Sequence, residues 1–216
     1  IYTFGVGAHG LFAQSAAGVS YTPGPDDDPE LEAVEGAAGT VEVNLDGTVL
    51  AFGDHSYGIF AQSGGTGGSG KITINIGDGT VMGGGGSGAG VLIAGGAVIT
   101  LTNEGLIMSF PGIQGCAVRS TSGDEFVATY GTMTGSVAPG AGANRIENFG
   151  MINAVAIYDL GLGTQLLNEV IFAPGGVDNV FASTVYGDFT QTAGGTLWFD
   201  VVFDFGTDSW DVLDID

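Results

Sequence analysis

Basic residues are almost absent from this chain, which carries 3 Lys and Arg against 24 Asp and Glu and has a formal net charge of −21. Proteins that bind duplex nucleic acid place Lys and Arg against the phosphates. Lys71, Arg119 and Arg145 are too few to form such a patch. Anionic membrane surfaces attract proteins through the same residue types. The composition therefore excludes nucleic acids and anionic membrane surfaces as partners.

Cysteine is nearly as scarce, because Cys116 is the only one and lies in the apolar run Gly-Cys-Ala-Val. An internal disulfide is thus excluded, and a buried, unreactive thiol is expected. The sequence starts at Ile1 without a basic segment, so we expect a piece of a mature protein without a signal peptide. The most apolar window, residues 91–101, is too short and too rich in glycine to span a bilayer.

Charged residues make up only 12% of the chain, whereas 44% of residues are hydrophobic and the mean hydropathy is +0.35. A chain of this composition can bury enough apolar surface to fold, so disorder is not expected. The 42 glycines among 216 residues indicate many tight corners. We expect residues 1–216 to form a single domain.

Two short motifs recur along the sequence. The first is Gly-Leu/Ile-Phe-Ala-Gln-Ser, found at residues 10–15 and 58–63, with weaker copies at 90–94 and 115–120. The second is an acidic residue and a glycine followed by two further residues, found at 46–49, 78–81 and 104–107. It continues at 148–152 and, in degraded form, at 168–172. The first motif follows the second at a nearly constant interval. Such regularity indicates a structural repeat.

Between the motifs, apolar and polar residues alternate as in β-strands, most clearly over residues 41–45, 72–76 and 197–205. A repeat with two or three short strands is the unit of a β-solenoid, whose coils bury an apolar face only when they are stacked. The sequence therefore predicts an all-β fold, a parallel β-helix. The alternative is a β-sandwich or jelly roll, in which unrelated strands and mixed turns are typical.

The alternation also predicts which side chains face the interior. Those expected inside are Phe60, Ile74, Ile76, Ile99, Leu101, Phe199 and Phe203, and those expected outside are Asp200, Asp204 and Asp208. Aromatic residues crowd the end of the chain, so residues 187–216 are predicted to form the most stable coils. Residues 64–70 and 83–90 are rich in glycine and are expected to be poorly packed loops.

Residues 22–39 interrupt the repeats and are expected to leave the solenoid as a loop insertion. Asp28 is a suitable N-cap residue, Pro29 suits the first helical position, and Gly36 can end a helix. The insertion is therefore predicted to carry a helix of about two turns.

No residue is predicted to be catalytic, cofactor-binding or metal-ligating. His9 and His55 each precede a copy of the first motif and are expected at coil corners, since the further ligands of a metal site are missing. Polysaccharide hydrolases and lyases that have a parallel β-helix fold place several carboxylates on one face, but a solvated acidic edge is the simpler interpretation of the carboxylates at the end of this chain. These carboxylates are Asp200, Asp204, Asp208, Asp211 and Asp214.

The acidic and glycine-rich loops raise the question of two ligands, calcium and phosphate. Residues 26–28 are three consecutive aspartates, but no calcium-binding repeat or EF-hand spacing is present, so only weak calcium binding by acidic loops is expected. Residues 83–86 are four glycines without a following Lys-Ser/Thr, so a phosphate loop is not expected.

The Gly-Ile-Phe-Ala-Gln-Ser-Gly-Gly segment at residues 58–65 resembles the repeat of autotransporter passenger domains of Gram-negative bacteria. The run Gly-Asp-Phe-Thr-Gln-Thr-Ala-Gly-Gly-Thr-Leu at residues 187–197, with its alternating sequel and Ser-Trp-Asp-Val-Leu at 209–213, is similar to the end of such passengers. The resemblance covers most of the chain outside residues 21–39.

This resemblance implies a right-handed parallel β-helix that is secreted to the cell surface or outer membrane of a Gram-negative bacterium, with an outer-membrane barrel expected in cis beyond residue 216. Passengers of this kind are mostly adhesins, and their catalytic domains, where present, are separate. We therefore expect a non-enzymatic, adhesive passenger or stalk segment. Its partner would be a host or surface receptor, a polysaccharide or a like protein. The alternatives are a self-assembling surface subunit and a carbohydrate-active β-helix enzyme.

Overall fold

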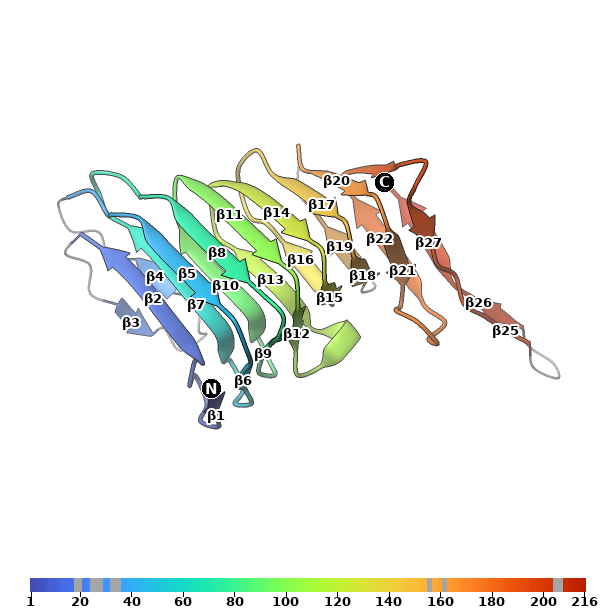
Figure 1. Ribbon diagram of the computed structural model, residues 1–216, viewed down its shortest axis with the longest axis horizontal. Helices are drawn as coiled ribbons and strands as arrows, with labels where there is room; N and C mark the ends of the chain where they lie inside the picture. Colours follow the sequence, from blue (N-terminus) through green and yellow to red (C-terminus); the bar gives the residue numbers. More distant parts are fainter. Residues whose placement is uncertain (18–20, 24–28, 32–35, 155–156, 161–162, 204–207) are drawn as a thin grey trace.

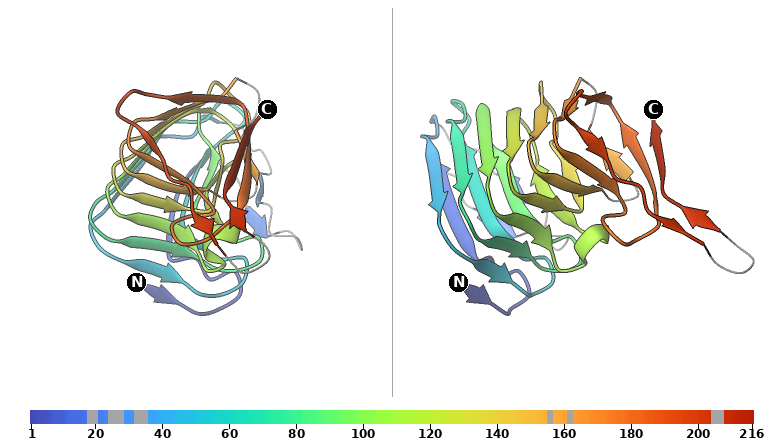
Figure 2. Two further views of the ribbon diagram at one scale, coloured as in Figure 1. Left: turned by 90° about the vertical axis from the view of Figure 1, so that its right-hand side faces the viewer. Right: turned by 45° about the vertical axis from the view of Figure 1, so that its right-hand side comes forward.

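A computed structural model of the chain describes residues 1–17, 21–23, 29–31, 36–154, 157–160, 163–203 and 208–216. The described strands are stacked as successive coils along one axis, with the N-terminal coil at one end and the C-terminal strands at the other (Figure 1). In each complete coil the chain passes through three parallel sheets in turn, which surround a common interior (Figure 2). The expected all-β fold and the parallel stacking of repeats are confirmed.

Four parallel sheets make up the sides of the stack. Sheet I contains β1 (Tyr2–Thr3), β6 (Val49–Ala51), β9 (Thr80–Gly83), β12 (Leu106–Ser109), β15 (Thr132–Thr134), β18 (Met151–Ala154), β21 (Ile171–Pro174) and β24 (Thr196–Leu197). Sheet II contains β5 (Val41–Leu45), β8 (Ile72–Ile76), β11 (Val98–Asn103), β14 (Asp124–Thr129), β17 (Arg145–Asn148), β20 (Gln165–Asn168) and β23 (Asp188–Gln191). Sheet III contains β2 (Leu11–Ala16), β7 (Tyr57–Gly64), β10 (Ala89–Gly95), β13 (Cys116–Ser120) and β16 (Ser136–Ala138). Sheet IV contains β19 (Ile157–Asp159), β22 (Ala182–Tyr186) and β27 (Val212–Ile215).

The interior is filled by rows of aliphatic side chains that lie in register from coil to coil. Ile72 pairs with Ile99, and Ile74 pairs with Leu101, at the centre of sheet II. Their side chains are fully buried, as is that of Ile76. The predicted inward positions in the middle coils are therefore confirmed.

The predicted inward positions near the end of the chain are wrong. Phe199 is 43% exposed and Phe203 is 81% exposed. Both belong to a segment that leaves the coils, in which β25 (Val201–Val202) pairs antiparallel with β26 (Ser209–Trp210) and extends away from the stack (Figure 1). Alternation along a strand does not distinguish a projecting hairpin from a coil, because both have the same period of two.

Phe60 is buried as predicted, but on the outer side of sheet III. Its neighbours Ile59 and Ala61 face the interior, whereas Phe60 belongs to a second apolar cluster with Tyr57, Leu92 and other side chains. Strand β7 is buried on both faces. Cys116 also belongs to this cluster and is buried, as expected.

The second motif forms the corner between sheets II and I, and its glycines stack from coil to coil. A Cβ atom added to Gly79 would lie 2.0 Å from the carbonyl oxygen of Gly47, and one added to Gly105 would lie 2.2 Å from that of Gly79. The stack continues through Gly131 and Gly150. Glycine recurs at this corner because a side chain would collide with the backbone of the preceding coil.

Asparagine side chains form a buried ladder just before this corner. Asn148 Nδ2 donates to Asn168 Oδ1 and to the carbonyl oxygen of Ile171, both at 2.6 Å, and Asn168 Nδ2 donates to Gln191 Oε1 at 2.8 Å. Asn103 Nδ2 donates to Thr129 Oγ1 at 2.9 Å. The ladder satisfies backbone carbonyl groups where the chain turns and the sheet hydrogen bonds end.

The insertion differs from its prediction where it is described. Tyr21–Pro23 (β3) pairs antiparallel with Pro29–Leu31 (β4), so the helix expected to begin at Pro29 does not form over these residues. The fixed φ of proline suits an extended edge strand as well as a helix start. Asp28 and residues 32–35 lie outside the described residues. The one helix among those described is the 3-10 turn Gly112–Gln114 (η1), so none there is long or apolar enough to cross a membrane.

The glycine-rich segment at residues 83–90 is packed more tightly than expected. Gly83, Gly84 and Gly85 are buried, and a Cβ atom on Gly84 would lie within 1.6 Å of the carbonyl oxygen of Gly53 in the preceding coil. Absence of side chains here allows backbone to pack directly on backbone. The expectation of a poorly packed loop is wrong for these residues.

Candidate functional site

Sheet I has an outer face without formal charge. None of its strands, all of which are described, contains Asp, Glu, Lys or Arg. This is unusual for a chain with a net charge of −21. Charged residues are normally placed on exposed sheet faces, where they keep the protein soluble and separate.

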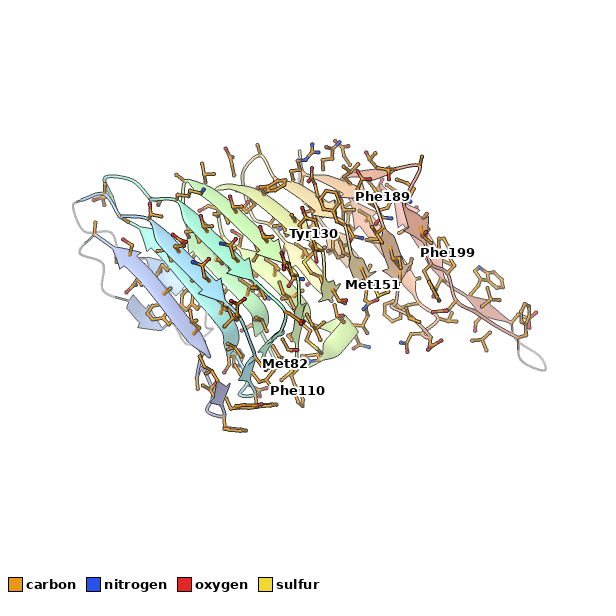
Figure 3. The ribbon with its side chains drawn as sticks, viewed as in Figure 1. Met82, Phe110, Tyr130, Met151, Phe189 and Phe199 are labelled. Atoms are coloured by element: carbon orange, nitrogen blue, oxygen red, sulfur yellow. The ribbon has the colours of Figure 1, made fainter. Side chains whose placement is uncertain are left out.

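Two rows of apolar side chains run across this face. In one row Tyr2 pairs with Leu50, Leu50 with Met82, and Met82 with Met108. In the second row Leu106, Met151 and Ile171 occupy equivalent outward positions, with Thr132 between the first two. Tyr2 is 63% exposed, and the other apolar side chains of the two rows are partly exposed. Figure 3 labels three side chains of this side of the molecule, Met82, Phe110 and Met151.

An aromatic group extends the apolar surface at the N-terminal end of sheet I. Phe4 and Phe52 stack with their ring centroids 5.1 Å apart, and Tyr2 stacks on Phe52 at 6.5 Å. Phe4 is 75% exposed and Phe110 is 63% exposed. We call the outer face of sheet I together with Phe4, Phe52 and Phe110 the apolar face. Contiguous exposed apolar surface of this kind is typical of interaction sites.

The outer face of sheet II has a different character. It presents paired Thr and Asn side chains, and Asn75 Nδ2 donates to Asn44 Oδ1 at 2.8 Å. Arg145 forms an ion pair with Glu147 and donates to Gln165 Oε1 at 3.1 Å on the same face. The outer faces of sheets I and II thus differ in polarity, so the charge-free surface is not shared by every side of the coils.

The histidines lie at coil corners, where they form structural contacts. His9 stacks on Tyr57 with centroids 4.9 Å apart, and its Nδ1 accepts a hydrogen bond from the backbone N–H of Tyr57 at 3.2 Å. His55 has φ +59° and its Nδ1 lies 2.7 Å from Ser87 Oγ. Among the described residues, no group of three or more His, Cys, Asp or Glu side chains is placed to hold a metal ion.

The C-terminal aspartates divide into structural and exposed side chains. Asp211 is 5% exposed and accepts hydrogen bonds from the backbone N–H groups of Phe181 and Asp200, at 2.6 and 2.7 Å. Asp200, expected outside, is half-buried and accepts from Asn179 N at 3.3 Å and from Trp198 Nε1 at 3.2 Å. Asp208 and Asp214 are exposed. Asp204 and residues 26–28 lie outside the described residues.

One carboxyl group lies inside the solenoid. Glu125 is 3% exposed and pairs with Ile99, so it occupies an inward position of sheet II. Ser120 Oγ donates to its Oε1 at 2.5 Å, while Oε2 has no hydrogen-bond partner among the residues that the structure describes. Burial raises the pKa of Glu125 to about 7, although the hydrogen bond from Ser120 lowers it in part.

Neither the apolar face nor the buried position of Glu125 was predicted from the sequence. Outward residues of sheet I, such as Leu50 and Met82, stand next to buried ones, so each strand reads as an ordinary apolar run. Only the register of successive coils shows that the outward ones form continuous rows. The absence of charge from the segments after each Asp-Gly or Glu-Gly corner was the signal available in the sequence.

Comparisons with protein families, curated proteins and solved structures found no match to this chain. The fold defines an all-β protein of parallel stacked coils, in which the strands of sheet I carry no formal charge.

Proposed function

We propose that this chain is a non-enzymatic passenger or stalk segment of an autotransporter-like protein, and that it acts by adhesion through its apolar face. The observation that carries the proposal is the charge-free outer side of sheet I. A solenoid presents the same side of every coil along its length, so a repeated outward row makes an extended binding surface.

The wider setting of this proposal rests on the sequence resemblance. The coils would form a right-handed helix, the direction that the twist of strands favours for parallel crossovers. The segment would be displayed at the surface of a Gram-negative bacterium. Its partner there would be a host or surface receptor, a polysaccharide or a like protein.

Adhesion can be tested with beads that carry the purified chain. Coated beads should bind to target cells or to a surface matrix, and the double variant Met82→Asp and Met108→Asp should lose most of this binding. The matched control is Thr73→Asp with Thr100→Asp, which places the same added charge on neighbouring strands of sheet II. Equal binding by both variants would contradict adhesion through sheet I, and labelling of intact source cells by antibodies would test surface display.

A second candidate function is a self-assembling surface subunit. It is favoured by apolar side chains exposed at the N-terminal coil, where Val6 is 77% and Phe12 is 50% exposed and strands β1, β2 and β5 are the edges of their sheets. Unpaired strand edges favour addition of another chain. Sedimentation velocity over a concentration series would detect end-to-end assembly, and Phe12→Ser should then reduce it.

A further inference from the structure

An acidic row borders the apolar face along the corner between sheets II and I. Three consecutive coils turn this corner through an exposed carboxylate, namely Asp46, Asp78 and Glu104. The glycines that follow them stack in succession, Gly79 on Gly47 and Gly105 on Gly79, so the three carboxylates are held on neighbouring coils. An apolar surface with negative charge along one margin results.

The same corner is hollowed on its sheet II side. A cavity of about 300 Å³ is lined by Asp46 and Glu104 together with side chains of Asn44, Asn75 and Thr102, among others. Carboxylate, amide and hydroxyl oxygens are acceptors that suit an ammonium or guanidinium group. The cavity is large enough for the end of a Lys or Arg side chain.

The rows of the apolar face have a spacing that suits an α-helix. Neighbouring strands of a sheet lie about 4.8 Å apart, and one helical turn rises about 5.4 Å. The mismatch is about 0.6 Å per turn. A helix lying along the solenoid axis would therefore bring one apolar residue per turn close to Leu50, Met82 and Met108 in succession. Its flank would lie over the acidic row.

The net charge of the chain favours a helix of a basic partner over a second copy of the chain as the ligand of the apolar face. Two copies would each carry a net charge of −21, and their mutual repulsion opposes contact except where salt screens it. A basic partner gains from the acidic row and from the field of the whole molecule. Charge complementarity therefore favours a basic amphipathic segment.

We propose that the apolar face binds a basic amphipathic helix of a partner protein, which lies along the solenoid axis with its apolar stripe on Leu50, Met82 and Met108 and its Lys or Arg side chains over Asp46, Asp78 and Glu104. This inference rests on the proposed binding function of sheet I and specifies the chemistry of the partner. It corresponds to the helix-in-groove type of peptide recognition, with the acidic row setting the orientation.

The test is fluorescence polarisation of the full chain with a labelled helical peptide of about 18 residues made of Leu and Lys. A peptide of the same pattern with Glu in place of Lys is the control for charge. The Leu/Lys peptide should bind, and Met82→Asp with Met108→Asp should weaken binding at least about tenfold. Thr73→Asp with Thr100→Asp should change the affinity much less, since it adds equal charge on sheet II.

Two further variants separate the apolar and ionic contributions. Met82→Thr with Met108→Thr adds no charge and uses the residue found at the next position of the row, Thr134, so it should fold and still weaken binding about threefold. Asp46→Asn, Asp78→Asn and Glu104→Gln together should reduce the dependence of affinity on salt concentration.

Equal effects of the sheet I and sheet II variants on the affinity would overturn the proposal, because binding would then not depend on the apolar face. Absence of peptide binding would also overturn the proposal of a basic helix. If the coated beads still adhere in that case, adhesion through sheet I stands and the partner is of another kind. Concentration-dependent dimers that are lost in Met82→Thr with Met108→Thr would assign the apolar face to a second copy instead.

Discussion

Glu125 lies in the interior row that runs through Val41, Ile72 and Ile99, although a carboxylate is unfavourable in such a place. Its pKa is raised from 4.5 to about 7 because burial disfavours the charged form. The folded protein therefore binds a proton more tightly than the unfolded chain does. Between about pH 4.5 and 7 the unfolded state loses that proton first, so the contribution of Glu125 to stability falls as the pH rises through this window.

We predict that Glu125→Gln stabilises the protein above pH 7 by roughly 1–3 kcal/mol and has little effect below pH 4.5. The other carboxylates also change stability with pH, so the informative quantity is the difference between the wild type and the variant. Urea unfolding at a series of pH values measures it. A difference independent of pH would contradict a raised pKa for Glu125.

A second prediction at the residue scale concerns the stability of variants at the corner glycines. Gly105→Ala should destabilise the fold by roughly 1–3 kcal/mol, because its Cβ atom would meet the carbonyl oxygen of Gly79 at 2.2 Å and one coil would have to move. Gly194→Ala is the matched control, since its nearest neighbour would be 3.7 Å away. Thermal unfolding of the two variants should differ clearly. Equal melting temperatures would mean that the coils are not stacked at this corner.

At the scale of elements, the buried asparagine ladder lies just before the corner in several of the coils. Asn148→Ala removes the Nδ2 donor to Asn168 Oδ1 and to the carbonyl oxygen of Ile171. It also removes the Oδ1 acceptor for the backbone N–H of Gly150. Buried polar groups left without partners cost about 1–3 kcal/mol each. We predict a loss of at least about 2 kcal/mol by chemical denaturation. The exposed Asn44→Ala should lose less than about 0.5 kcal/mol, and a comparable loss there would contradict a special role for the ladder.

The coil elements were predictable from sequence where local pattern and tertiary environment agree. Alternation at residues 41–45 and 72–76 and the repeated acidic-glycine corner identified strands and turns that the structure confirms. The first motif was aligned correctly for its first three copies, in which residues 10, 58 and 90 stack. Its copy at residues 115–120 was misaligned, because Cys116 pairs with Ala89 rather than with Val91.

Features that depend on register or on departure from the stack were not predictable. Gly131 belongs to the corner stack but follows Tyr130 instead of an acid, so the motif did not include it. The hairpin β25–β26 alternates like a coil strand yet projects from the end. The apolar face exists only because outward residues from several coils coincide, a relation that one strand alone does not contain.

At the scale of the whole molecule, burial is concentrated in the middle coils. Ile74, Leu101 and Ile107 are fully buried there, whereas Leu197 and Leu213 near the end are only partly buried. The expectation that residues 187–216 are the most stable coils assumed buried aromatic rings, and Trp198, like Phe199 and Phe203, is exposed. Stability in a stack of coils depends on each coil and its neighbours. The burial pattern therefore favours the middle coils as the stable unit.

Hydrogen exchange measured by mass spectrometry should show this distribution. We predict the slowest exchange in strands β8 to β12 and faster exchange in β24 to β27, since local stability follows apolar burial. Protection that is strongest over residues 187–216 would restore the original expectation and contradict the burial argument.

Oxidation of the four methionines tests the stacked coils and the apolar face together. Met82, Met108 and Met151 lie outward on sheet I and are partly exposed, whereas Met133 of the same sheet points inward and is fully buried. Hydrogen peroxide should therefore convert the three outward methionines to sulfoxides well before Met133 in the native protein, as measured by peptide mass spectrometry. In the unfolded chain all four should react at similar rates. Oxidation of native Met133 as fast as that of its three neighbours would contradict both the register of sheet I and the apolar face built on it.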